Sequence, residues 1–481
     1  MKTIVSKIAL ALFLTLAFSS TRVLADQTRP NLVVILCDDL GYSDVGFNGA
    51  TDIKTPKLDQ LALGGTVCIS AYVTHPFCGP SRMGLMSGRY PHSFGGPYNL
   101  PPDGNCPEGI PESETLISTV LKRAGYFTGA VGKWHMGVAA PFHPNQRGFD
   151  DYYGFLGGGH EYFPSHYRPI YDRQRNNGVA NIREYVRPLE HNGKEVKEDQ
   201  YITDALSREA VRFVNEAAAK EQPFFLYLAY NAPHTPLQAK EEDMLRFANI
   251  DDSNRRTYAA MVYAVDRGVG QLVDALLATS QLDKTLIVFL SDNGGKLSAG
   301  ATNVPLREGK GSVYEGGFRV PMFFHWPGTV AAGKRFAHPV STLDLYPTFA
   351  RLAQASIPAG KQLDGKDIWD ALLDGRNPRS GETIFALRHR NGYSDVGVRQ
   401  DQWKACRVAN QPWKLFNIEQ DIVEQHDVGL QHPTTLRQMV RQAERWSQTH
   451  TQARWFDSPK VKDGWQAANM PNYDETFRID K

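Results

Sequence analysis

The sequence predicts an α/β protein: a large, mainly parallel mixed sheet sandwiched by helices, followed by a small antiparallel sheet with one helix. First, its longest apolar runs, such as residues 32–36, are continuous, as in strands buried on both faces. Second, helical patterns separate these runs, which is typical of parallel sheets. Third, short strand-like segments follow one another directly after about residue 380.

The elements of the large sheet are expected to alternate along the chain. Thr55 and Pro56 form a helix start, with proline at the first helical position, and Gly64 ends that helix. A further helix is expected to begin at Cys78, just before Pro80. The other expected helices span residues 113–124, 204–219 and 257–278, and the expected strands span 32–36, 127–131, 224–229 and 286–290.

The last hundred residues have a different pattern. The expected strands there are residues 383–387, 393–399, 403–407 and 413–417, and the expected helix spans 434–454. Because a Pro- and Gly-containing stretch precedes them, we predict a catalytic domain at 26–380 and a C-terminal α+β subdomain at 381–481. Residues 157–192 lack periodicity and are expected to form an irregular insertion that shapes a pocket.

The N-terminus has the pattern of a secretory signal peptide at residues 1–25. Lys2 and Lys7 precede an apolar run over residues 8–18, which is too short to span a bilayer. We therefore expect an exported protein, periplasmic or secreted, with no membrane span. Removing Lys2, Lys7 and Arg22 with this segment changes the formal charge from +1 to −2, which does not favour nucleic-acid binding.

Export is compatible with disulfides, but the sequence does not define any. Four cysteines besides Cys78 could pair in three ways, so the pairing stays open. They are Cys37, Cys68, Cys106 and Cys406.

Polar clusters directly follow the expected buried strands, and parallel strands bring their carboxyl ends to one edge of a sheet. These clusters are Asp38–Asp39, Lys133–His135, Asn231–His234 and Asp292–Asn293. Asp38, Asp39, Asp292 and Asn293 offer only oxygen ligands, and three carboxylates close together repel without a cation. The sequence therefore predicts a Ca²⁺ site, with Mg²⁺ as the alternative.

Residues 78–89 contain the most informative motif of the chain. Its residues Cys78, Pro80, Ser81, Arg82, Leu85 and Ser87–Arg89 resemble the signature of the type I sulfatases, which belong to the alkaline phosphatase superfamily. Further segments are similar to this family in the same order: Asp38–Gly41, Gly132–His135, Pro233–His234, Gly309–Lys310 and Glu315–Pro321. The resemblance covers residues 30 to about 430 and includes exported polysaccharide sulfatases, N-acetylgalactosamine-6-sulfatases and arylsulfatases.

The resemblance implies how the reaction proceeds. A formylglycine-generating or anaerobic sulfatase-maturating enzyme would oxidise Cys78 to 3-oxoalanine (formylglycine). One hydroxyl of the hydrated aldehyde attacks sulfur, and the other later expels sulfate. In the family, residues matching Asp38, Asp39, Asp292 and Asn293 bind calcium, which also touches the modified Cys78.

The same resemblance implies roles for the basic residues. Lys133 and Lys310 would flank the sulfate, and Arg82 would contact the diol. His234 would protonate the leaving alcohol, and His135 would act during sulfate release.

The substrate expected from this pattern is a sulfated oligo- or polysaccharide. Its expected contacts are His143, Arg147, His160, Glu161, Arg168 and His325. Two alternatives stay open: a phosphonate or phosphate-ester hydrolase of the same superfamily, and a carbohydrate-binding protein whose cysteine is never modified. The sugar, the sulfate position, exo or endo action, the oligomeric state and the pH optimum are not defined.

Overall fold

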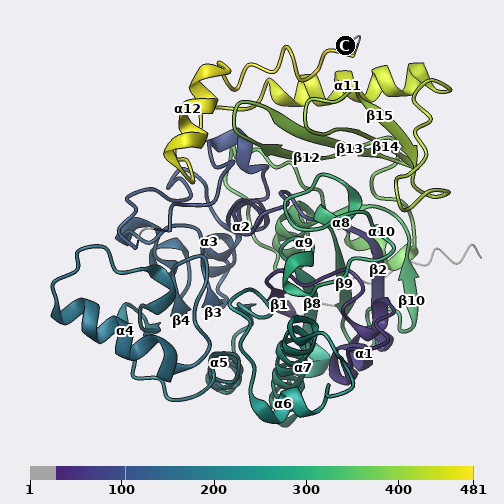
Figure 1. Ribbon diagram of the computed structural model, residues 1–481. Coiled ribbons are helices and arrows are strands. Elements are labelled where there is room, and N and C mark those ends of the chain that lie inside the picture. Colours follow the sequence, from purple (N-terminus) through teal and green to yellow (C-terminus); the bar gives the residue numbers. More distant parts are fainter. Residues whose placement is uncertain (1–28, 103, 480–481) are drawn as a thin grey trace, which may run out of the picture.

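The computed structural model describes residues 29–102 and 104–479, so the expected signal peptide lies outside the described residues. Its main feature is an eleven-stranded mixed sheet (Figure 1), in the order β10-β2-β9-β8-β1-β7-β3-β4-β5-β6, with β11 beside β2. A separate four-stranded sheet has the order β12-β13-β14-β15. The predicted fold class is confirmed.

Parallel strands form the centre of the large sheet. β1 (Asn31–Cys37) lies between β7 (Phe224–Ala229) and β8 (Thr285–Ser291), and both neighbours run parallel to it. β3 (Phe127–Lys133) pairs with β7 on one side and with β4 (Asp151–Phe155) on the other. The carboxyl ends of these strands therefore meet at one edge of the sheet.

Both faces of the central strands are buried, and β1 shows this directly. Leu32, Val34 and Leu36 pack in one core with α2 (Cys78–Ser87), α3 (Ile117–Arg123) and α9 (Leu345–Leu352). The alternate side chains Val33, Ile35 and Cys37 pack in the opposite core with α1 (Pro56–Leu63), α5 (Ile202–Ala218) and α7 (Ser253–Ala278). Burying each large aliphatic side chain contributes roughly 1.5–3 kcal/mol, which explains the continuous apolar runs.

One side of the sheet is antiparallel and was not fully predicted. β9 (Arg319–His325) runs antiparallel to both β8 and β2 (Thr66–Tyr72). The polar residues Thr66 and Ser70, both buried, interrupt the apolar pattern of β2, so that strand was missed. The remaining short elements are β5 (Glu190–His191), β6 (Lys194–Glu195), β10 (Lys334–Phe336), β11 (Val340–Ser341), α6 (Glu241–Leu245), α8 (Glu315–Phe318) and α10 (Trp369–Asp374).

The expected irregular insertion at 157–192 contains a helix, α4 (Pro164–Asn176), which corrects the prediction. Only Tyr167 and Tyr171 of this helix are buried, and Pro169 lies inside it. A segment with only two buried side chains and an internal proline lacks the hydrophobic periodicity that predicts a helix.

The C-terminal region forms its own layer at one end of the molecule (Figure 1). Its antiparallel strands are β12 (Thr383–His389), β13 (Ser394–Gln400), β14 (Trp403–Arg407) and β15 (Lys414–Asn417). α11 (Pro433–Ser447) covers them, and a second helix, α12 (Pro459–Ala467), corrects the expectation of one helix. The domain boundary near residue 380 stays a prediction.

Two expectations from the sequence concern disulfides and membrane spans. Cys37, Cys68, Cys78 and Cys406 are buried free thiols. Within the described residues, the helices include none that is both long and apolar enough to cross a bilayer.

Candidate active site

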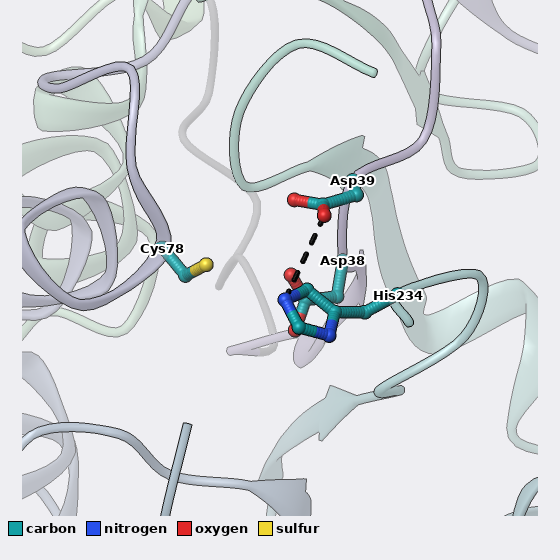
Figure 2. Close-up of side chains that lie close together, drawn as sticks. All are labelled: Asp38, Asp39, Cys78 and His234. Carbon is teal, nitrogen blue, oxygen red and sulfur yellow. Dashed lines mark ion pairs between the residues drawn. The ribbon is translucent and has the colours of Figure 1, made fainter. Parts of the chain in front are cut away.

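The strand ends gather the predicted polar residues at one edge of the large sheet. Asp38 and Asp39 follow β1, Lys133 and His135 mark the end of β3, and His234 follows β7. Asp292 and Asn293 follow β8. Cys78 reaches the same place from α2, facing the Asp38–Asp39 pair and His234 (Figure 2).

A cavity of about 800 Å³ opens above this edge. Cys78, His135, His234 and Lys310 line it. Asp38, Arg82 and Lys133 are buried beneath it. A ligand in the cavity would therefore contact the cysteine, both histidines and Lys310, with further charges below.

The carboxylates beneath the cavity have unused oxygen atoms. Asp38 Oδ1, Asp39 Oδ2 and Asn293 Oδ1 are buried without a hydrogen-bond partner within the described residues. Donor atoms of Asp38, Asp39, Cys78 and His234 lie within 4.8 Å of one another. Buried carboxylate oxygens without partners are costly, and an oxygen-rich set of this kind suits Ca²⁺ or Mg²⁺. The residues present therefore fit the predicted cation.

Three basic side chains balance these carboxylates. Arg82 Nε donates to Asp292 Oδ2 at 2.9 Å, and its Nη1 donates to the Lys133 carbonyl at 3.0 Å. Lys133 forms an ion pair with Asp38. Lys310 Nζ lies 2.6 Å from Asp39 Oδ1 and 3.3 Å from Cys78 Sγ, so it links the carboxylates to the cysteine.

Two of these carboxyl groups, those of Asp292 and Asp38, differ in pKa. Burial, and next the charge of Asp38, raises the pKa of Asp292 to about 6. Burial also opposes ionisation of Asp38, but Lys133, His234 and Arg82 hold its pKa well below its usual range. An added cation would favour the ionised form of both groups.

Cys78 is poorly suited to act as an ordinary thiol. It is the first residue of α2 and is only 2% exposed. Burial, followed by the charge of Asp38, raises the pKa of its thiol to about 12, although Lys133 and Lys310 oppose the rise. The thiolate is the reactive form of cysteine, so the encoded side chain is inert at neutral pH.

The two histidines are held in different ways. His234 Nδ1 donates to the Thr235 carbonyl at 2.7 Å, since a carbonyl can only accept, and Nε2 lies 3.7 Å from Asp39 Oδ2 (Figure 2). Burial lowers the pKa of His234 to about 4. A Cβ atom at position 158 would lie 2.7 Å from His135 Nε2, which is too close for a non-bonded contact. Glycine at this position therefore leaves room for the His135 ring. Asp39 and His135 both have positive φ, which is rare outside glycine.

None of the six residues predicted to contact the substrate lines the cavity. Their polar groups contact the protein instead. Arg147 donates to the carbonyls of Ile110, Pro111 and Glu114, and His160 contacts those of Glu161 and Arg187. His143 pairs with Glu190, Glu161 with Arg183 and Gln238, Arg168 with the Val196 carbonyl, and His325 with the Leu61 carbonyl.

Other polar residues line the cavity and were not predicted. They are Asn99, Glu184, Tyr185, Thr235, Lys296, Ser298, Glu308, Ser312, Arg388, Arg390 and Asp457. They come from several separate segments, including a short 3-10 helix (Glu184–Val186) and the edge strand of the small sheet, so no single local motif marks them. Gly158, Glu184 and Tyr185 of the segment 157–192, which we expected to shape a pocket, line the cavity.

The fold and the site together define a hydrolase of anionic esters. The family model described as Sulfatase matches residues 30–355, and the model described as N-sulphoglucosamine sulphohydrolase, C-terminal, matches residues 309–449. The chain therefore belongs to the sulfatase family and is a sulfuric ester hydrolase.

Named relatives and solved structures agree with this assignment. Arylsulfatase J of Mus musculus is 31% identical over 90% of this chain and 78% of its own length. N-acetylgalactosamine-6-sulfatase of Mus musculus is 34% identical over 78% of this chain and 71% of its own. The crystal structure of Ps i-CgsB in complex with k-i-k-neocarrahexaose is 59% identical, with a TM-score of 0.93, over 94% of this chain and all of that one.

Proposed function

We propose that this enzyme removes sulfate from a sulfated carbohydrate of the neocarra-oligosaccharide type. The supporting observation is its 59% identity, across 94% of the chain, to a protein bound to k-i-k-neocarrahexaose. The open cavity of about 800 Å³, lined by polar and charged side chains, has room for a sugar chain.

The proposed nucleophile is the oxidised form of Cys78, 3-oxoalanine, whose hydrated aldehyde supplies a hydroxyl for attack on sulfur. The need for oxidation follows from the buried, protonated thiol, which has little nucleophilic character. A maturation enzyme, formylglycine-generating or anaerobic sulfatase-maturating, is therefore a necessary partner.

The charged residues around position 78 stabilise a bound sulfate ester. Ca²⁺ held by Asp38, Asp39, Asp292 and Asn293, with Mg²⁺ as the alternative, would supply positive charge beside the sulfate. Lys310, within 3.3 Å of Cys78 Sγ, is placed to bind a sulfate oxygen. Lys133 and Arg82 hold the carboxylates in place from below. Fixed charges of this kind need no reorganisation during the reaction.

His234 is proposed as the proton donor for the leaving alcohol. Its Nδ1 is fixed by the Thr235 carbonyl, so the transferred proton must come from Nε2. Nε2 lies 3.7 Å from Asp39 Oδ2, and the charges of Asp38 and Asp39 favour its protonation, whereas burial, which dominates, and the charges of Lys310 and Lys133 oppose it. The role therefore requires that the bound sulfate ester, an anion, raises the pKa of His234. His135, which follows the neighbouring strand β3 at the same edge of the sheet, is proposed to act on the nucleophile during sulfate release.

Mass spectrometry of one peptide tests the nucleophile. Trypsin releases residues 58–82, which contain both Cys68 and Cys78. We expect alkylation of Cys68 and an aldehyde at position 78, so Cys68 is an internal control. Two alkylated thiols in fully active enzyme would refute the mechanism.

Desulfation of k-i-k-neocarrahexaose, followed by chromatography, tests the substrate. We expect release of sulfate with an intact sugar chain. No release, in enzyme that still hydrolyses an aryl sulfate, would refute the neocarra-type substrate. Faster turnover of an aryl phosphate than of an aryl sulfate would favour a phosphate-ester hydrolase.

We also propose that the protein is exported, periplasmic or secreted, after removal of residues 1–25. The proposal is based on Lys2, Lys7 and the apolar run that follows them. Fractionation of cells expressing the full chain should place the enzyme outside the cytoplasm, and deletion of residues 2–25 should retain it inside. Equal distribution of the two proteins would contradict export through this segment.

A further inference from the structure

Two arginines from the small sheet reach the catalytic cavity. Arg388 lies in β12 and Arg390 directly follows it, and both line the cavity that contains Cys78. The C-terminal sheet therefore contributes side chains to the active-site cavity, although it supplies none of the residues assigned to the reaction.

Arg388 lies beside the reacting residues. Its Nη1 donates to the Gly311 carbonyl at 2.5 Å, and its guanidinium lies 4.5 Å from the Phe77 ring centroid. Phe77 precedes Cys78, and Gly311 follows Lys310. Lys310 Nζ lies 6.0 Å from the same Phe77 centroid, so Arg388 and Lys310 are no farther apart than the sum of these two distances.

Carboxylates only partly balance the positive charges of Arg388 and Arg390. Arg390 Nε pairs with Asp395 at 2.7 Å. Among the described residues, no carboxylate lies within ion-pair distance of Arg388, although the charges of Asp395 and Asp457 act on it. Burial, and next the charge of Arg390, lowers the pKa of Arg388 to about 10, so it is still a cation at neutral pH. A partly buried guanidinium without a carboxylate partner favours an anionic ligand.

We propose that Arg388, oriented by Phe77 and Gly311 and assisted by Arg390, binds a second sulfate ester of the substrate, distinct from the sulfate that is hydrolysed. The proposal rests on the proposed function, because it requires a substrate with more than one sulfate. A planar guanidinium can donate two parallel hydrogen bonds to a sulfate, as it does to carboxylates and phosphates.

The other charged residues of the cavity limit where this sulfate can lie. Glu184, Glu308 and Asp457 line the cavity, and their carboxylates would repel a sulfate placed against them, whereas Lys296 adds a further cation. Asp457 also acts on Arg388, so the second sulfate would have to displace that interaction to bind the guanidinium at the edge of β12. This arrangement would select both the presence and the position of a neighbouring sulfate.

Binding of k-i-k-neocarrahexaose to the inactive Cys78→Ser protein, measured by calorimetry, tests the proposal. Arg388→Gln in this background should raise the Kd about ten- to a hundred-fold, the range for a lost charge-assisted contact. For a neocarra-oligosaccharide with one sulfate, the same change should raise Kd less than about threefold. Arg388→Lys should cause an intermediate loss, because lysine keeps the charge but cannot donate in parallel.

Two further variants make the test specific. Arg376→Gln is a matched control, since Arg376 pairs with Asp374, its side chain is 65% exposed and it does not line the cavity. Arg390→Gln provides a second test if Arg388→Gln does not fold, as judged by circular dichroism. It should weaken binding of the hexaose more than binding of the singly sulfated ligand.

The outcomes separate this proposal from the proposed function. Equal weakening of both ligands, no weakening, or no binding of the hexaose would overturn the second-sulfate site. Arg388-dependent binding of a singly sulfated oligosaccharide that contains a uronate would also overturn it, in favour of a carboxylate site. Arg388-dependent binding of the hexaose by Cys78→Ser, with no desulfation by the mature enzyme, would refute the proposed function and support the site.

Discussion

Three buried histidines and one half-buried histidine lie where the large sheet meets the C-terminal layer, and they predict that the protein loses stability in mild acid. The ring centroid of His92 lies 5.5 Å from that of His75, 5.4 Å from His389 and 5.0 Å from His450. Aromatic rings of Tyr98, Trp446, Trp465 and Tyr473 surround them. Ser394 Oγ contacts His389, and Arg388 is the nearby cation acting on His75.

Burial lowers the pKa of all four histidines. The pKa of His92 falls to about 3, and the others fall well below the usual value. In the unfolded chain a histidine titrates near 6.5, so below that pH the unfolded chain binds more protons than the folded one. Stability is therefore full above about pH 6.5 and declines as the pH falls towards 3.

The size of the effect follows from the pKa difference. Each histidine held neutral costs about 1.4 kcal/mol for each pH unit below 6.5. At pH 5 this is roughly 2 kcal/mol for His92. The other three histidines act in the same direction. Since domains are stable by about 5–15 kcal/mol, the contribution of His92 alone is a large part of the total.

Urea unfolding of His92→Phe between pH 7.5 and 4.5 measures this contribution. Phenylalanine keeps an aromatic ring but cannot be protonated, so the slope of unfolding free energy against pH should fall by about 1.4 kcal/mol per unit. His426→Gln is the matched control, because His426 is 81% exposed and should leave the slope unchanged. Parallel pH profiles for His92→Phe and the parent would refute the reasoning.

Three further predictions concern the active site. A chelator should abolish activity, and full activity in chelator would refute the cation site. Ca²⁺ at a hundred-fold excess over its Kd stabilises the folded protein by about 2.7 kcal/mol. Its removal should therefore lower Tm by about 3 °C, as measured by scanning calorimetry. His234→Ala should reduce kcat by roughly 10²–10⁴ on sugar sulfates and much less on activated aryl sulfates, and equal losses would remove its acid role. Lys310→Met should lower kcat on aryl sulfates by about 10²–10³ without preventing oxidation of Cys78, and near-normal turnover would contradict its contact with sulfate.

The sequence predicted those parts of the fold in which local pattern and tertiary environment agree. β1, β7 and β8 are buried on both faces, so their apolar runs are continuous and easy to recognise. The polar residues that follow such strands must then gather at one edge, and the structure places Asp38, His234 and Asp292 there. This convergence is a consequence of parallel pairing and needs no knowledge of the reaction.

The residues that line the rest of the cavity could not be predicted in the same way. Residue type alone suggested Arg147 and His160 as substrate contacts, yet both are buried and donate to or contact backbone carbonyls. Whether an arginine faces a ligand or a carbonyl depends on tertiary packing, which local sequence does not encode. Arg388 was missed for the same reason, because its place in the cavity depends on how the small sheet docks.

The strand-end residues and the other cavity-lining residues differ in how rigidly the fold holds them. Asp39 and His135 sit directly past strands whose two faces are buried, and both have positive φ, a strained backbone that only a rigid surrounding maintains. Groups that must meet a transition state to within a fraction of an ångström belong on such elements. Arg388 and Tyr185 come from an edge strand and a short 3-10 helix, where we expect replacement to change which sugar fits without displacing Cys78 or its carboxylates. The docked C-terminal sheet can therefore vary with the substrate while the strand ends of the large sheet retain the chemistry.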